Sequence, residues 1–202
     1  MKRIYITAVP LESNFRIESK PVNPVGFSLP NAPDQSAFPI VPIVASSAEP
    51  GDDVLVITVR QANEPHNSNL DILHEELASL QLQHLRFKDV TMPESQDRDV
   101  LLALFKRMID AAETDACYYA CMTFGTKTYP VVLFSVLSYI CKVIPETELK
   151  GIYYQEIRRA EGQLKDAYLY NVTPLFLLNR VVDFAASADG NAAALISALL
   201  EG

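Results

Sequence analysis

The feature that most constrains this chain is the alternation of short apolar segments with longer amphipathic ones. Six segments rich in β-branched and aromatic residues are predicted to be strands. They cover residues 3–9, 53–60, 85–91, 116–124, 151–158 and 168–173. Connections long enough for a helix separate most of them, which is typical of parallel strands joined by right-handed crossovers. The alternation therefore predicts an α/β fold, a Rossmann-like three-layer domain with a mostly parallel central sheet.

Helical spacing of apolar residues identifies the connecting segments. Helices are expected at 68–83, 129–144, 174–188 and 191–200. Another helix is expected to begin at a cap formed by Ser95 or Asp97 and to include an apolar stripe that ends at residue 109. Residues 38–48 are ambiguous, because their β-branched content favours a strand while both prolines fit the first turn of a helix. We favour a helix there, ended by Pro50 and Gly51.

A proline-rich insert follows the first strand. Eight of the thirteen prolines fall between Pro10 and Pro50, so this region cannot form one regular element. We assign the insert to residues 10–37 and expect a small hairpin or an ordered flap at 15–30. Without a recognisable linker, residues 1–202 are expected to form a single domain, with a C-terminal helix at 190–202 and no fused effector domain.

Charge and hydropathy exclude several classes of function. The formal net charge is −8 and no long basic stripe is present, which argues against binding long nucleic acid or an anionic membrane surface. The longest apolar run, 129–141, is shorter than the roughly 18 to 20 residues that a bilayer requires. The first residues read as a strand and not as a cleavable signal. A cytoplasmic location is the resulting expectation.

The three cysteines are expected to be reduced. Cys117 and Cys121 are four residues apart on one predicted strand, a separation of about 13 Å. A disulfide cannot span that distance. No metal site is expected either, since the histidines are not clustered and the second histidine of H-E-x-x-H is replaced by Ala78. No cofactor is expected.

The junction at residues 122–130 carries the sharpest local signal. A buried strand ends there and a helix begins, a place that faces the ligand crevice in an open α/β sheet. Gly125 permits close approach of a ligand, Lys127 adds a positive charge, and Thr126, Thr128 and the first helical N–H groups supply donors. The junction is therefore either a phosphate site or a tight turn with a solvated lysine. It is not a Walker loop, because that spacing is absent.

Two other loops are expected at the same edge of the sheet. Thr7 ends the first strand, where it is either a phosphate donor or a buried residue. The loop at 61–69 contains Asn67, whose amide suits the edge of a base, although asparagine is also common in loops that cap helices.

Residues 119–127 read YACMTFGTK and are followed by Pro130 and an apolar helix. This run resembles the signature of CRISPR-associated Rossmann-fold (CARF) domains, which sense cyclic oligoadenylates in type III CRISPR defence. The strand at 152–158 and the run YNVTPLF at 170–176 agree in order with that family. The resemblance covers about residues 1–9 and 38–188, and the proline-rich insert departs from it.

The resemblance implies a homodimer that holds a cyclic oligoadenylate, with tetra-adenylate the expected ring, across its two-fold axis. The implied ligand-binding residues come from three loops: Thr7, Ala8, Val9, Asn67, Thr123, Phe124, Gly125, Thr126 and Lys127. As a sensor the protein only holds the ring. As a ring nuclease, the alternative, it cleaves the ring without metal through the ribose 2′-hydroxyl, with Lys127 and Thr7 as catalytic residues. An unrelated Rossmann-like nucleotide-binding enzyme is disfavoured, because no G-x-G-x-x-G follows the first strand.

Overall fold

The computed structural model describes residues 1–10, 16–22, 27–61, 68–92, 94–161, 163–187 and 197. Its elements follow the predicted alternation: β1 (Lys2–Ala8), β2 (Ser19–Val22), α1 (Ile40–Ser47), β3 (Asp53–Gln61), α2 (Ser68–Ala78), β4 (His84–Met92), α3 (Arg98–Asp110), β5 (Ala116–Cys121), α4 (Tyr129–Val143), β6 (Thr147–Ala160), β7 (Gln163–Asn171) and α5 (Thr173–Ser187). The chain divides into two compact units, Met1–Asn171 and Val172–Gly202.

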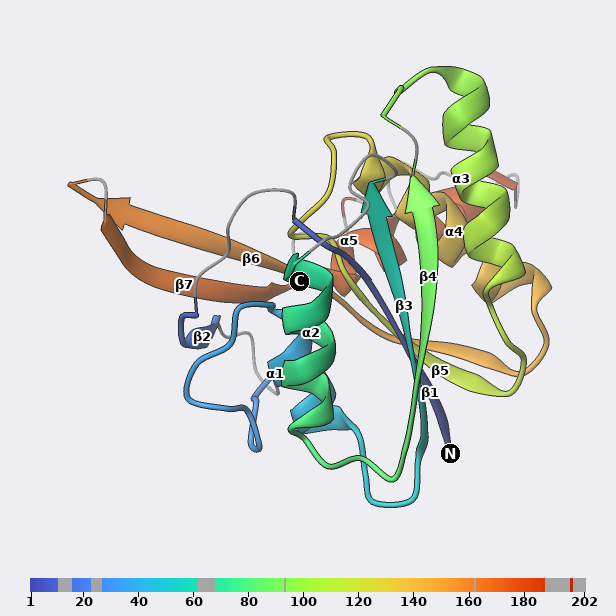
Figure 1. Ribbon diagram of the computed structural model, residues 1–202. Helices are drawn as coiled ribbons and strands as arrows, with labels where there is room; N and C mark the ends of the chain where they lie inside the picture. The colour runs from blue at the N-terminus through green and yellow to red at the C-terminus, as the bar shows by residue number, and fades with distance from the viewer. Residues whose placement is uncertain are drawn as a thin grey trace. The chain divides into compact units, whose positions relative to one another are not determined.

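A seven-stranded sheet organises the first unit, in the order β2-β7-β6-β5-β1-β3-β4 (Figure 1). All neighbouring strands run parallel except β6 and β7, which are antiparallel. These two strands form a ribbon that extends beyond the rest of the sheet. The predicted α/β class with a mostly parallel sheet is confirmed.

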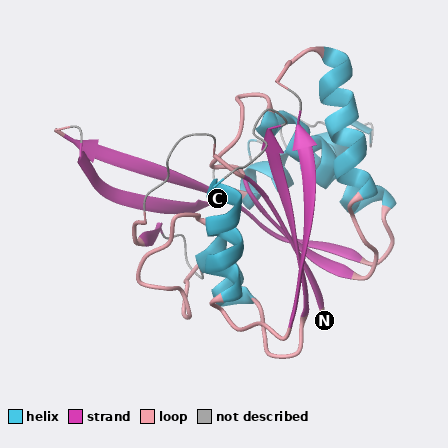
Figure 2. Cartoon of the chain, in the orientation of Figure 1, coloured by secondary structure: helices cyan, strands magenta, loops and turns pink. Residues whose placement is uncertain are grey.

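Helices cover both faces of the sheet, which gives the three layers of a Rossmann-like fold (Figure 2). Helices α1 and α2 contact each other on one face, and α3 and α4 contact each other on the opposite face. The core on the α1 and α2 face joins Ile40 and Val44 of α1 and Leu73 and Leu77 of α2 to buried strand residues such as Tyr5. This arrangement follows from right-handed crossovers, because the chain moves outward from β1 to β4 and then returns to β5 on the other side of β1.

Helix α1 confirms the prediction for the ambiguous segment at 38–48. It begins after Pro39 and contains Pro42 in its first turn, where the missing N–H removes no intrahelical bond. Its apolar residues Ile40, Val41, Ile43 and Val44 are buried. Burial on the sheet therefore stabilises a helix whose β-branched residues favour strands locally.

Several predicted boundaries were wrong. Helix α2 ends at Ala78 and not near residue 83, because Gln81 adopts a left-handed conformation with φ 55°. Strand β5 ends at Cys121, three residues before the predicted end. Strand β6 extends from Thr147 to Ala160 and β7 begins at Gln163, so both are longer than the strands predicted at 151–158 and 168–173. Left-handed Glu161, with φ 54°, lies in the tight turn between them.

The described part of the insert makes two backbone pairings. Ser19–Val22 pairs in parallel with β7, and Ile17 and Ser36 form an isolated antiparallel bridge. The expected hairpin or flap at 15–30 falls partly on residues 15 and 23–26, which lie outside the described residues. The strand pairs with β7 at the sheet edge, a long-range contact that the local pattern did not indicate.

The second unit contains α5, which Thr173 and Pro174 open as expected. The predicted helix at 191–200 lies outside the described residues, apart from position 197. No helix in the described part of the chain is long and apolar enough to cross a membrane. The three cysteines are free, with Cys117 and Cys121 buried and Cys141 half-buried.

Candidate functional site

The carboxyl ends of β1 and β5 lie side by side, with Thr7 opposite Cys121. From β1 the chain proceeds towards β3, and from β5 it proceeds in the opposite direction towards β6. The two loops therefore separate at a topological switch point, which is where open α/β sheets bind their ligands. The sheet thus brings the predicted residues of the first-strand loop and of the 122–130 junction to one place.

Gly125 lies where these two loops pack closely against each other. Its φ of +103° belongs to a region that residues with a side chain rarely adopt. A Cβ atom at this position would lie 3.0 Å from the ring of Tyr129 and 3.1 Å from the Cβ of Ala8. The glycine is therefore required both by its backbone conformation and by the close contact between the β5–α4 loop and the end of β1.

Replacing Gly125 with alanine will lower the free energy of unfolding by about 2–5 kcal/mol, the sum of backbone strain and overpacking. Gly51 provides the matched control, because its φ is +89° while no atom lies within 4 Å of an added Cβ. Gly51→Ala therefore measures strain alone, about 1–2 kcal/mol. Urea denaturation of both variants checks the difference, and equal losses would contradict the packing role of Gly125.

Threonine hydroxyls hold the β5–α4 loop in position. The Thr123 hydroxyl accepts a hydrogen bond from the Gln155 N–H at 2.8 Å and lies 3.2 Å from the Cys121 thiol. The hydroxyls of Thr126 and Thr128 are 3.0 Å apart, and that of Thr128 donates to the Gln96 side-chain oxygen. The loop is thus tied to β6 and to the segment before α3, and these hydroxyls already have partners.

The N–H groups in the first turn of α4 were expected to face a ligand, but they donate to carbonyl groups of the loop instead. The N–H of Tyr129 donates to the Thr126 carbonyl at 3.0 Å, those of Val131 and Val132 donate to the Thr128 carbonyl, and Pro130 has none. The free donors lie earlier in the loop. Within the described residues, the successive N–H groups of 125–127 have no acceptor. Successive free N–H groups next to a residue of positive φ suit an anion.

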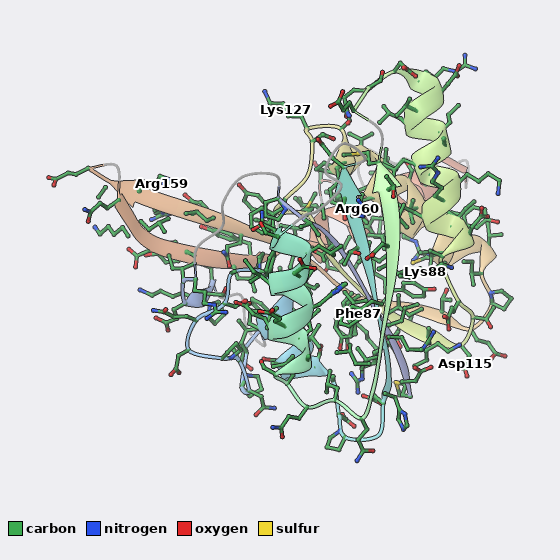
Figure 3. All side chains as sticks on the ribbon, in the orientation of Figure 1. Arg60, Phe87, Lys88, Asp115, Lys127 and Arg159 are labelled. Atoms are coloured by element: carbon green, nitrogen blue, oxygen red, sulfur yellow. The ribbon has the colours of Figure 1, made fainter. Side chains whose placement is uncertain are left out.

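Lys127 is exposed at this loop and points away from the body of the protein (Figure 3). Among the residues that the structure describes, no carboxylate pairs with it. Its ammonium group therefore adds an uncompensated positive charge beside the free N–H groups of 125–127. Together they form a local site for negative charge on a protein whose net charge is −8.

The first-strand loop contributes in a different way from the expectation. Thr7 is 1% exposed and its hydroxyl donates to the Ala8 carbonyl at 3.3 Å. Ala8 and Val9 are buried as well, and the N–H of Val9 donates to the Val59 carbonyl. These residues form the wall against which the glycine loop packs. The Thr7 hydroxyl as it lies does not face solvent.

Two further predicted residues complete the set. Phe124 is half-buried and packs edge-on against Phe38, with ring centroids 6.3 Å apart. Asn67 lies outside the described residues. The structure thus brings Thr7, Ala8 and Val9 together with residues 123–127, mainly through backbone and apolar contacts.

The ionisable groups beneath the loop are neutral at physiological pH. Burial raises the pKa of the Cys121 thiol, and it also raises the pKa of the Tyr129 hydroxyl well above its usual range. The Tyr129 hydroxyl is buried without a hydrogen-bond partner. No group of three or more His, Cys, Asp or Glu residues in the described part of the chain is arranged to hold a metal ion. The arrangement supports binding of an anion more directly than nucleophilic catalysis.

Sequence reasoning missed two residues at this edge. Arg60, near the end of β3, was interpreted only as the last residue of a strand, although strand ends of one edge converge in this fold. Gln96 belongs to a segment interpreted only as a helix cap, and no local pattern predicts its contact with Thr128.

Comparisons with known proteins identify no relative: no protein-family model matches the chain, and no curated protein matches it either. The resemblance to CARF domains therefore depends on the motifs in the sequence. The fold and the position of the 122–130 junction are compatible with it.

Proposed function

We propose that the protein binds a cyclic oligoadenylate, with tetra-adenylate the expected ring, across a homodimer and acts as a sensor in type III CRISPR defence. One observation carries the proposal. The motif that resembles CARF domains lies at the switch point of the sheet and presents the free N–H groups of 125–127 beside unpaired Lys127. The chemistry of this loop matches a phosphodiester group.

A two-fold arrangement of the chain strengthens this match. A ring of identical nucleotides has rotational symmetry, and a homodimer presents each binding loop twice. Two lysines and two sets of backbone donors then act on one polyanion, so a protein with net charge −8 attracts it locally. The proposed ligand is therefore bound at a stoichiometry of one ring per two chains.

The position of Thr7 favours sensing over the ring-nuclease alternative. Cleavage requires groups that align the 2′-hydroxyl with its own phosphate and stabilise the charge that develops. Thr7, one of the two residues assigned to that chemistry, is buried and its hydroxyl bonds the Ala8 carbonyl. Lys127 alone stabilises charge but does not orient an attacking group.

Replacing Lys127 with alanine will weaken binding of cyclic tetra-adenylate by about 10- to 100-fold, the range for losing one charge-assisted hydrogen bond. Calorimetry measures affinity and stoichiometry on the same sample. Lys142→Ala, in the last turn of the helix α4 that follows this loop, is the control and is expected to bind as the wild type does.

A single-turnover incubation without metal, with protein in excess over labelled cyclic tetra-adenylate, separates the two activities. Retention of an intact ring supports the sensor, and linear products support the ring nuclease. Absence of binding to the tetra-, tri- and hexa-adenylate rings would refute the proposed function.

A further inference from the structure

Arg60 has a buried nitrogen without a partner. The Nε atom of its guanidinium is shielded from solvent and makes no hydrogen bond. Guanidinium groups carry a permanent charge, and a buried donor that remains unpaired costs stability. Such groups are rare in folded proteins, so each one calls for an explanation by a bound water, ion or ligand.

The position of Arg60 in the sheet connects it with the candidate site. Val59 lies opposite Ala8, so Arg60 is beside Val9 at the carboxyl edge. Adjacent strands are about 4.8 Å apart, and Ala8 is also the residue that contacts the Gly125 loop. Arg60 and Lys127 consequently lie at the same end of the sheet, the end to which the arrows of β3 and β4 point (Figure 3).

The carboxylate on the neighbouring strand does not neutralise Arg60. Asp89 of β4 lies opposite Thr58 of β3. Thr58 precedes Arg60 by two residues, so Thr58, Asp89 and Arg60 are on the same face of the sheet. Its carboxylate accepts a hydrogen bond from the Thr58 hydroxyl. In the described part of the chain Arg60 forms no ion pair, with Asp89 or with any other acidic residue.

We propose that Arg60 binds a second negatively charged group of the ligand held by the 125–127 loop. The ends of β3 and β5 flank the end of β1, so the two cationic groups approach the ligand from opposite sides of that strand. A ligand that satisfies both carries at least two negatively charged groups, which favours an oligonucleotide over a nucleoside monophosphate. This inference rests on the proposed function, because it concerns the same site.

Arg60→Met tests the inference, because methionine keeps an unbranched apolar stem and removes the charge. Affinity for cyclic tetra-adenylate is expected to fall about 10- to 100-fold. The slope of log affinity against log salt is expected to decrease by about 0.7, the value for one lost phosphate contact on a single strand. The melting temperature without ligand is expected to be no lower than that of the wild type, since an unpaired buried donor is removed.

Arg159→Met is the matched control, because Arg159 lies at the far end of the β6–β7 ribbon and its loss changes the net charge equally (Figure 3). Inorganic triphosphate serves as a second probe that contains no nucleoside. Weaker binding of both probes by Arg60→Met alone supports the inference. A lower melting temperature with an unchanged salt slope would assign Arg60 a structural role and overturn it.

The two probes separate the inference from the proposed function. If cyclic tetra-adenylate binds Arg60→Met as tightly as the wild type, the inference is overturned while the proposed function stands. If only triphosphate binds, and binding depends on Arg60, the inference stands while the proposed ligand is rejected. Binding of neither probe to the wild type overturns both.

Discussion

Replacing Asp52 with alanine will lower the free energy of unfolding by about 3 kcal/mol. The Asp52 carboxylate is buried and accepts hydrogen bonds from the Arg3 guanidinium and, at 2.8 Å, from the Glu49 N–H. Breaking a buried ion pair typically costs about 3–5 kcal/mol. We take the lower end because Arg3 retains the Tyr119 hydroxyl at 3.1 Å and the Glu49 carboxylate at 3.3 Å. Urea denaturation at neutral pH measures the loss.

Asp53→Ala is the control for this prediction. Asp53 is the next residue and is half-buried, and its carboxylate, 42% exposed, pairs with exposed Arg86. Exposed pairs contribute under about 1 kcal/mol, so this variant is expected to remain close to the wild type. Similar losses for Asp52→Ala and Asp53→Ala would contradict the importance of the buried pair.

The pH dependence of stability provides a second measurement on Asp52→Ala. Burial alone would raise the pKa of Asp52, but hydrogen bonds from the Met1 amino group, the Glu49 N–H and Arg3 together lower this pKa below its usual value. A carboxyl group whose pKa is lower in the folded than in the unfolded protein stabilises the folded state fully at pH values above its unfolded pKa, about 3.9. This contribution is lost as the pH falls through the pKa of the folded protein. The gap between wild type and variant is therefore constant near pH 7 and narrows below about pH 4.

Replacing Glu76 with alanine will lower the free energy of unfolding by about 2–3 kcal/mol and release the insert from α2. The buried Glu76 carboxylate accepts hydrogen bonds from Arg16 at 2.8 Å, from the Ser36 hydroxyl at 2.7 Å and from the Ala37 N–H at 3.1 Å. Loss of the hydrogen bonds to one charged group typically costs about 1.5–3 kcal/mol, and exposed Arg16 contributes little to this cost. Hydrogen exchange of residues 16–38 and urea denaturation measure the two effects.

Glu75→Ala is the matched control, because Glu75 is the preceding residue of the same helix and is exposed. It is expected to change neither stability nor exchange. Faster exchange of residues 16–38 in Glu75→Ala as well would indicate that the helix, and not the Glu76 carboxylate, holds the insert in place.

Local patterns predicted the fold where strands and helices alternate strongly, and failed where pairing is long-range. Strand β3 is buried from Val54 to Val59 and is apolar there except for Thr58, so its prediction needs no distant partner. Residues 163–166 are polar except for Leu164 and none of them is buried, and they form a strand because β6 supplies the hydrogen-bonding partner. The pairing of Ser19–Val22 with β7 joins residues more than a hundred positions apart, which no local pattern records.

The candidate site was predictable in location but not in detail. Gly125 marked a close approach in the sequence, and the structure supplies the neighbours, Ala8 and Tyr129. Two details depend on which strand ends and loops lie next to one another, and the sequence does not record this. They are the unpaired Nε of Arg60 and the hydrogen bond from Thr128 to Gln96. Thr7 could be interpreted from the sequence as either a donor or a buried residue, and only its exposure of 1% shows that it is buried.

The hydroxyl contacts of Thr123, Thr126 and Thr128 bear on the thermodynamics of any ligand that binds the β5–α4 loop. Because these contacts fix the loop to β6 and to Gln96 without a ligand, little conformational entropy remains to be lost on association. Because no slow rearrangement of the loop precedes association, we expect association rate constants to differ little between related ligands. Differences in affinity between such ligands are then expected to come mainly from their dissociation rate constants.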